Sequence, residues 1–173
     1  MIRKSLLGLL LAAACAAPAA AEPATLLGVF QNWSAFSTGS GSSLTCYALS
    51  EPRATRPSNV KRGPIFLMVS DWPARKVKAE PQIVFGYPTK EDGAASLAVA
   101  ADKYAFFMRN EAGGDGNGWL KALGDNERLI EAMTKGVSAV AKGISKRGTN
   151  TTDTYSLAGF TDAMAKVHAA CNM

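Results

Sequence analysis

The sequence has 173 residues, of which 19 are basic and 14 acidic, giving a formal net charge of +5. Residues 1–21 contain two of the basic residues and no acidic one, so the remaining chain has a net charge of only +3. About 150 residues suit one domain that buries enough apolar surface to fold alone. This mild charge, on a chain that its N-terminus marks for export, argues against nucleic acid as a partner.

Residues 1–21 have the pattern of a secretory signal peptide. Arg3 and Lys4 provide the positive start, and an apolar stretch follows that is shorter than the roughly 20 residues of a membrane helix. Ala19 and Ala21 are the small residues that a signal peptidase requires. We therefore expect an exported protein of residues 22–173, without a transmembrane segment.

A lipoprotein is the minor alternative at this end of the chain. Cys15 follows a leucine and three alanines, and it would become the lipid-modified first residue in that case. The leucine lies one position too far upstream for this motif. The expected location is the periplasm or the outer surface of a bacterium.

Two cysteines remain after residue 21, Cys46 and Cys171. An even number of cysteines in an oxidising compartment is most simply a disulfide. The two cysteines lie 125 positions apart. A disulfide that closes a loop of that length stabilises a fold by about 4 to 5 kcal/mol in the chain-entropy model. The alternative is a pair of buried thiols.

Hydrophobic patterning predicts a mostly β domain with two short helices. The helices are expected from Asp125 or Asn126 to Gly136, and from about Leu157 to Cys171, where apolar residues recur every three or four positions. A single strand is expected at residues 26–36. The other expected strands are residues 44–49, 65–69, 82–87, 96–101, 103–109 and 137–144, of which 65–69 should be buried on both faces. Such a chain favours an antiparallel sandwich or curled sheet flanked by the terminal helix.

The sequence contains no recognisable catalytic or cofactor motif. His168 is the only histidine, which excludes a multi-histidine zinc site, and no phosphate-binding glycine loop is present. We therefore expect no enzyme, no metal and no cofactor. A periplasmic hydrolase that uses Ser156 or another hydroxyl with His168 is one alternative, and a small-ligand carrier with an apolar pocket is another.

Basic and aromatic residues in loops are the candidate surface contacts. The polar, proline-containing segment 50–64 is basic, and a glycine-rich turn spans residues 113–118. Solvated charges that discourage edge-to-edge pairing are the plainer interpretation of the basic residues. The candidate contact residues are Arg53, Arg56, Lys61, Arg62, Trp72 and Trp119.

Several motifs resemble the invasion-associated locus B family of exported proteobacterial proteins. They extend over nearly the whole chain after residue 21. The matching segments are residues 30–33, 46–50, 119–121, 142–149 and 151–160, with the terminal Cys171.

The resemblance implies an immunoglobulin-like antiparallel β-sandwich located in the periplasm or at the outer surface. It also implies a role associated, in pathogenic relatives, with entry into host cells, and it brings no enzymatic activity. The expected function is therefore a non-catalytic envelope protein that binds an unidentified envelope or host-surface component.

Overall fold

The computed structural model describes residues 22–90, 94–109, 116–122 and 124–173, which contain 11 strands and two α-helices. The strands are β1 (Thr25–Phe30), β2 (Trp33–Thr38), β3 (Thr45–Ser50), β4 (Ala54–Arg56), β5 (Phe66–Trp72), β6 (Val77–Val84), β7 (Ala95–Val99), β8 (Asp102–Arg109), β9 (Asn117–Leu120), β10 (Ser138–Ile144) and β11 (Asn150–Ser156). The helices are α1 (Asp125–Lys135) and α2 (Phe160–Cys171), with short 3-10 turns at Gly41–Ser43 and Pro73–Arg75. The expected signal peptide lies outside the described residues.

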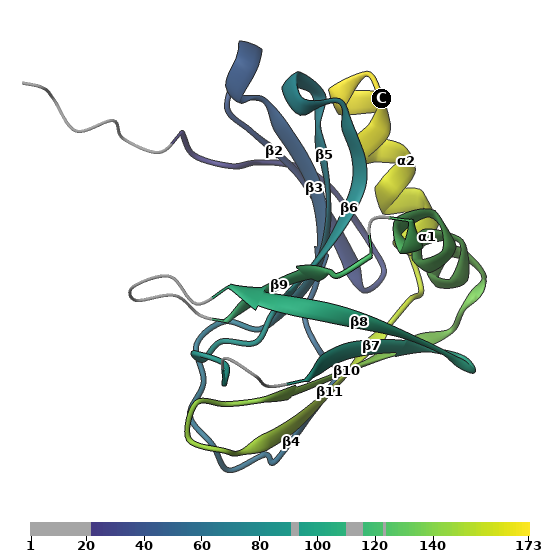
Figure 1. Cartoon of the computed structure of the whole chain (residues 1–173). Coiled ribbons are helices and arrows are strands. Elements are labelled where there is room, and N and C mark those ends of the chain that lie inside the picture. Colours follow the sequence, from purple (N-terminus) through teal and green to yellow (C-terminus); the bar gives the residue numbers. More distant parts are fainter. Residues whose placement is uncertain (1–21, 91–93, 110–115, 123) are drawn as a thin grey trace, which may run out of the picture.

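The strands form one antiparallel sheet in the order β1-β2-β3-β5-β6-β9-β8-β7-β10-β11-β4. Figure 1 shows β2, β3, β5 and β6 standing upright beside α2, whereas β7, β8, β10 and β11 run across the lower part. The sheet therefore bends between β6 and β9 and makes both layers of a sandwich. The predicted fold class, a mostly β sandwich with a mid-chain helix and a C-terminal helix, is confirmed.

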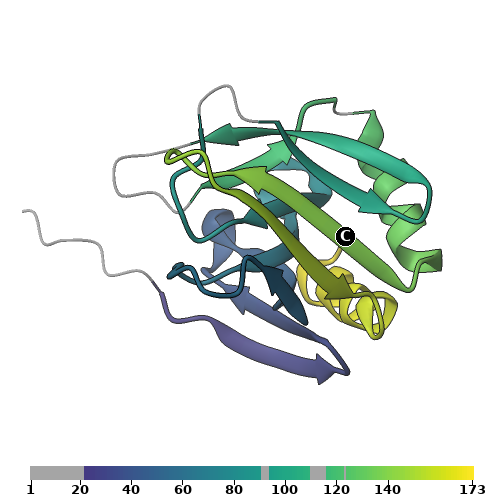
Figure 2. The same cartoon turned by 90° about the horizontal axis from the view of Figure 1, so that it is seen from below.

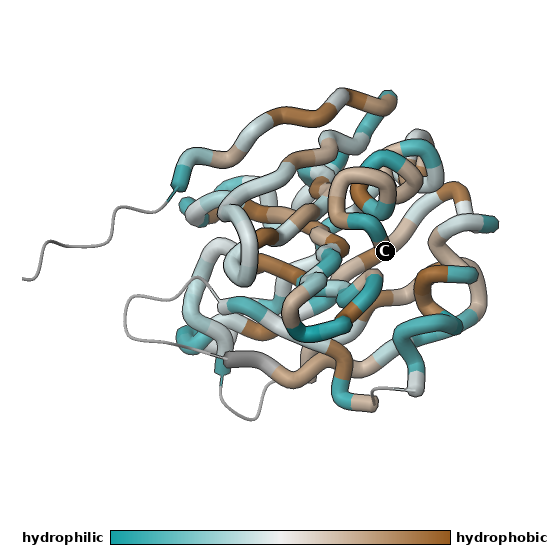
Figure 3. Tube along the Cα trace, turned by 90° about the horizontal axis from the view of Figure 1, so that it is seen from above, coloured by the Kyte–Doolittle hydropathy of each residue, from teal (hydrophilic) through white to brown (hydrophobic). Residues whose placement is uncertain are grey.

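The two layers share one hydrophobic core. The indole of Trp33 at the start of β2 is fully buried, and its Nε1 donates a hydrogen bond of 2.9 Å to the Ser156 carbonyl at the end of β11. The chain also crosses directly from β3 in one layer to β4, which pairs with β11 in the other. Figure 3 shows hydrophobic stretches along the interior strands and hydrophilic ones at most turns.

Both helices use the faces that their sequences predict. In α1, Leu129 and Met133 are fully buried, and the helix ends before Gly136. In α2, Phe160 packs against Trp33 with ring centroids 4.9 Å apart. Figure 2 shows α2 (yellow) beside the N-terminal strands (purple), in agreement with its contacts to β1 and β2.

Two sequence predictions need correction. Residues 26–36 do not form one strand but the hairpin of β1 and β2, whose turn contains Gln31 at a φ of 53°. The strand at residues 65–69 is central as predicted, yet it is fully buried on one face only, because Phe66 and Met68 are half-buried. In addition, β4, β9 and β11 were not predicted as strands. No helix in the described ranges is long and apolar enough to cross a membrane.

Candidate functional site

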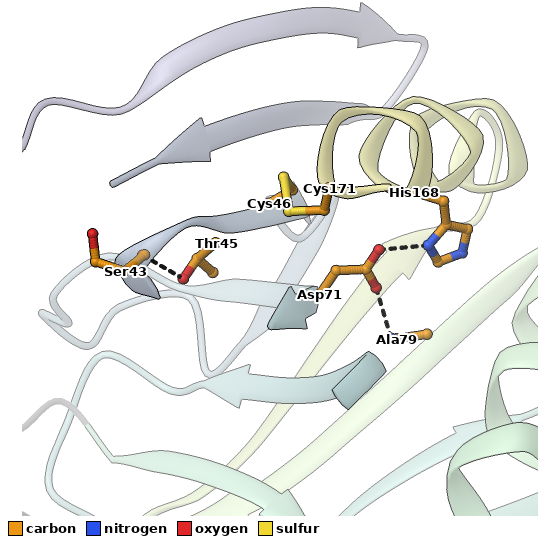
Figure 4. The surroundings of a disulfide bond; sticks show 7 residues. All are labelled: Ser43, Thr45, Cys46, Asp71, Ala79, His168 and Cys171. Atoms are coloured by element: carbon orange, nitrogen blue, oxygen red, sulfur yellow. Dashed lines mark hydrogen bonds and ion pairs between the residues drawn. A yellow bond between two sulfur atoms is a disulfide. The ribbon is translucent and has the colours of Figure 1, made fainter. Parts of the chain in front are cut away.

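The predicted disulfide between Cys46 and Cys171 is present. Cys46 points inward from β3, and Cys171 is the last residue of α2 (Figure 4). Both side chains are buried, and the Cα atoms lie 5.9 Å apart. The bond closes a sequence separation of 125 residues and fixes the terminal helix on the sheet.

A buried carboxylate next to the disulfide holds the same helix. Asp71 on β5 has a fully buried side chain, and its Oδ2 lies 2.6 Å from Nδ1 of His168 on α2 (Figure 4). Its Oδ1 accepts a hydrogen bond of 2.8 Å from the backbone N–H of Ala79 on β6. Asp71 therefore connects α2 with two adjacent strands, which is a structural task for a buried carboxylate.

The pairing of Ser156 with His168 that a hydrolase would need is not formed. Ser156 Oγ accepts a hydrogen bond of 3.2 Å from the Ala158 backbone, two residues further along the chain. Among the described residues, the partner of His168 is the Asp71 carboxylate and not a hydroxyl group. The His168 imidazole is thus oriented by a carboxylate, and Ser156 is not bonded to it.

The described surface contains a depression of about 660 Å³, which we call the basic depression. Three chain segments line it: residues 60–63 before β5, residues 86–88 after β6, and the β10–β11 turn together with Thr151 of β11. Four of the lining residues are cationic, and none of the described lining residues is acidic. The four cations are Lys61, Arg62, Lys146 and Arg147.

Arg62 is fixed in the floor of the basic depression. Its Nη1 and Nη2 donate hydrogen bonds of 2.7 and 2.6 Å to the two carboxylate oxygens of Asp153 on β11. Its Nε and Nη2 also donate to the Phe85 carbonyl at 3.0 and 2.9 Å. The side chains of Arg62 and Asp153 are only 5% and 0% exposed, so Arg62 belongs to the lining of the basic depression but its side chain adds little to the exposed surface. The buried Asp153 carboxylate on β11 thus binds the Arg62 guanidinium through two charge-assisted hydrogen bonds.

Tyr87 is the aromatic residue of the basic depression. The guanidinium carbon of Arg62 lies 5.0 Å from the centroid of the Tyr87 ring, within the range of a cation–π contact. The Tyr87 hydroxyl lies 2.5 Å from Oγ1 of buried Thr151. Burial raises the pKa of Tyr87, an effect that the Thr151 hydrogen bond and the charge of Arg62 oppose. The hydroxyl is therefore neutral at physiological pH.

The remaining three cations, Lys61, Lys146 and Arg147, are exposed at the rim of the basic depression. Because Asp153 cancels the charge of Arg62, the net charge that the described lining presents to a ligand comes from these three side chains. Sequence reasoning named Lys61 but missed Lys146 and Arg147. The sequence feature that could have indicated these two residues is a pair of adjacent basic residues in the short turn between two strands.

A comparison with solved structures gives one significant likeness for this architecture. The matched chain is 12% identical, the match covers 84% of this chain and 98% of the other, and the TM-score is 0.59. The fold is that of invasion associated protein B from Bartonella henselae. No family model and no curated protein sequence matches this chain. The likeness to invasion associated protein B thus concerns the fold, which is what the sequence resemblance implied.

The other candidate contacts lie apart from the basic depression. Arg53 precedes the edge strand β4 and Arg56 is its last residue. Both are exposed, and neither lines the basic depression. Trp72 is half-buried, and the guanidinium carbon of Arg75 lies 5.2 Å from its ring centroid. Trp119 on β9 stacks on Phe107 of β8 with centroids 5.9 Å apart. Residues 113–115 of the glycine-rich turn lie outside the described residues.

Proposed function

We propose that this chain is an exported, non-catalytic envelope protein that binds a negatively charged partner through the basic depression. The observation that carries the proposal is the convergence of three exposed cations on a concave surface whose described lining contains no carboxylate. Like-charged side chains that converge in this way attract an anionic partner and steer its approach.

Three features support export and a host-facing role as parts of this proposal. The first 21 residues have the pattern of a signal peptide. The disulfide between Cys46 and Cys171 suits an oxidising compartment outside the cytoplasm. The structure with the same fold is that of an invasion associated protein, which favours contact with a host surface over a metabolic task.

Retention of the purified protein on surfaces tests this proposal. Protein recovered from the periplasm of an expressing bacterium is incubated with isolated bacterial envelopes and with host cells, and the bound fraction is measured. The test variant is Lys146→Glu with Arg147→Glu at the rim. The control is Lys103→Glu with Lys166→Glu, which changes the net charge equally at exposed positions that do not line the depression.

We expect the rim variant to lose at least nine-tenths of its retention on one of these surfaces, while the control keeps most of it. Charge reversal at the contact replaces attraction by repulsion, whereas the same change elsewhere alters only the weak long-range field. Equal retention of the two variants would refute the assignment of the basic depression as the contact surface.

A further inference from the structure

We infer that the ligand of the basic depression is an anionic saccharide of one or two sugar units, in which a sulfate, carboxylate or phosphate group provides the charge. The inference rests on the proposed function and specifies its ligand. It follows from the size and rigidity of the depression, the placement of its charges, and the groups between those charges.

The depression has the dimensions and rigidity of a small-ligand site. Its volume of about 660 Å³ falls within the range of roughly 300 to 1,000 Å³ that is typical of such sites. Backbone hydrogen bonds join its walls, from the Gly63 N–H to the Gly86 carbonyl at 2.7 Å and from the Lys146 N–H to the Pro88 carbonyl at 2.8 Å. A site whose walls are already joined loses little conformational entropy when it binds a ligand.

The charges are divided between floor and rim. In the floor, Arg62 makes hydrogen bonds to Asp153 and to the Phe85 carbonyl, which occupy most of its donors. At the rim, no acidic partner of Lys61, Lys146 or Arg147 is found among the described residues. The rim therefore selects a ligand with one or a few negative groups attached to a body that enters the depression.

The surface between the charges suits the body of a sugar. Val60 and Pro88 present carbon atoms, and the half-buried Tyr87, whose ring already packs against Arg62 and Phe85, adds the remaining part of its ring to the lining. Ser145 accepts a hydrogen bond from the Thr149 N–H at 3.1 Å, which leaves its hydroxyl hydrogen available as a donor. Sugars combine apolar C–H faces with hydroxyl groups. A sugar can therefore contact the carbon atoms of this lining and also accept a hydrogen bond from Ser145.

Two other kinds of negatively charged partner, a membrane surface and an acidic peptide, fit the basic depression less well. A membrane surface is flat and would contact the rim but leave the floor empty. An extended acidic peptide binds best along an exposed strand edge, where its backbone groups find partners. The depression lies instead at the ends of strands, between the turn after β6 and the β10–β11 turn.

Calorimetric titration of the purified protein tests the inference with five defined probes. They are a sulfated uronic-acid disaccharide, the same disaccharide without sulfate, a hexose 6-phosphate, maltose as the neutral sugar, and inorganic sulfate. A tetraglutamate peptide is titrated in parallel. The same titrations use the variants Lys146→Glu with Arg147→Glu, and Tyr87→Phe, with Lys103→Glu and Lys166→Glu as the control.

We expect at least one of the charged sugars to bind at least tenfold more tightly than maltose, inorganic sulfate and the peptide. The rim variant should lose tenfold or more in affinity. Tyr87→Phe, which keeps the aromatic ring and removes only the hydroxyl bonded to Thr151, should lose less than twofold, as should the control. Equal binding of inorganic sulfate would show a simple anion site, and preferred binding of the peptide would show a protein partner; either result overturns the inference. If no probe binds while surface retention still depends on the rim charges, the saccharide fails and the proposed function stands.

Discussion

Arg62 and Asp153 lie 91 positions apart in the sequence, and their side chains make two hydrogen bonds of 2.7 and 2.6 Å. The pair joins the segment before β5 to the middle of β11, and therefore one layer of the sandwich to the other. It also sets the floor of the basic depression. Both side chains are almost fully buried, so solvent screens this pair only weakly.

Replacing one member of this pair should destabilise the fold strongly. Arg62→Met leaves the Asp153 carboxylate buried without its partner, and we expect the free energy of unfolding to fall by about 3 to 5 kcal/mol. Arg128→Met is the matched control, because its ion pair with Asp125 is exposed, and it should cost less than about 1 kcal/mol. Urea unfolding measures both. A loss below 1 kcal/mol for Arg62→Met would contradict the structural role given to the pair.

Removal of the disulfide should lower stability without changing the fold. Replacement of Cys46 and Cys171 by alanine frees a loop of 125 residues, which costs up to about 4 to 5 kcal/mol in the chain-entropy model. Thermal unfolding with and without reductant measures the effect, and the double variant should not respond to the reductant. Labelling of both cysteines by an alkylating reagent before reduction would show that the bond does not form.

Loss of the Asp71 carboxylate should loosen α2. Asp71→Ala removes the acceptor for the Ala79 N–H and for His168, and we expect a loss of about 2 to 4 kcal/mol in unfolding free energy. Asp71→Asn keeps an acceptor oxygen and should cost clearly less. Hydrogen exchange of the α2 amides reports the local effect. Unchanged exchange in Asp71→Ala would mean that this contact does not hold the helix.

Tyr155 should make stability depend on pH in the alkaline range. Its side chain is fully buried, and burial, followed by the nearby Asp153 charge, raises the pKa of the hydroxyl above its usual value near 10. Above that pH the unfolded chain releases the proton and the folded chain keeps it. The unfolded state then binds fewer protons, so the free energy of unfolding falls as pH rises.

Comparison with Tyr155→Phe isolates this contribution. Between pH 10 and 11 the wild-type protein should lose roughly 1 kcal/mol more stability than the variant. At pH 8 the variant should be about as stable as the wild type, because no described residue accepts or donates a hydrogen bond at the Tyr155 hydroxyl. Urea unfolding at pH 8, 10 and 11 measures the two quantities. Equal losses of stability in the two proteins between pH 10 and 11 would contradict Tyr155 as the origin of the pH dependence.

The sequence predicts those parts of this fold whose signals are local. The terminal helix was predictable because apolar residues recur at Phe160, Met164, Val167 and Cys171, and the same spacing turned the cysteine toward β3. The β1–β2 turn was missed because Gln31 takes a left-handed φ that glycine or asparagine usually signals. Neither occupies that position, so the segment was predicted as one strand.

Non-local contacts account for the other differences. The inward face of β11 carries Thr151 and Asp153, polar residues that do not give the apolar alternation of a half-buried strand. Their burial depends on Arg62 and Tyr87, which come from distant segments. The basic depression likewise combines three segments, so a sequence pattern predicts its individual charges but not their convergence.

Site-specific photocrosslinking in living cells tests most directly whether the basic depression is the contact surface. A diazirine-bearing lysine analogue replaces Lys146 at the rim or, as the control, Lys166 on α2, both exposed. After irradiation, mass spectrometry of the recovered protein should show partner adducts from position 146 and not from position 166. Adducts from both positions alike, or none from position 146, would contradict the account.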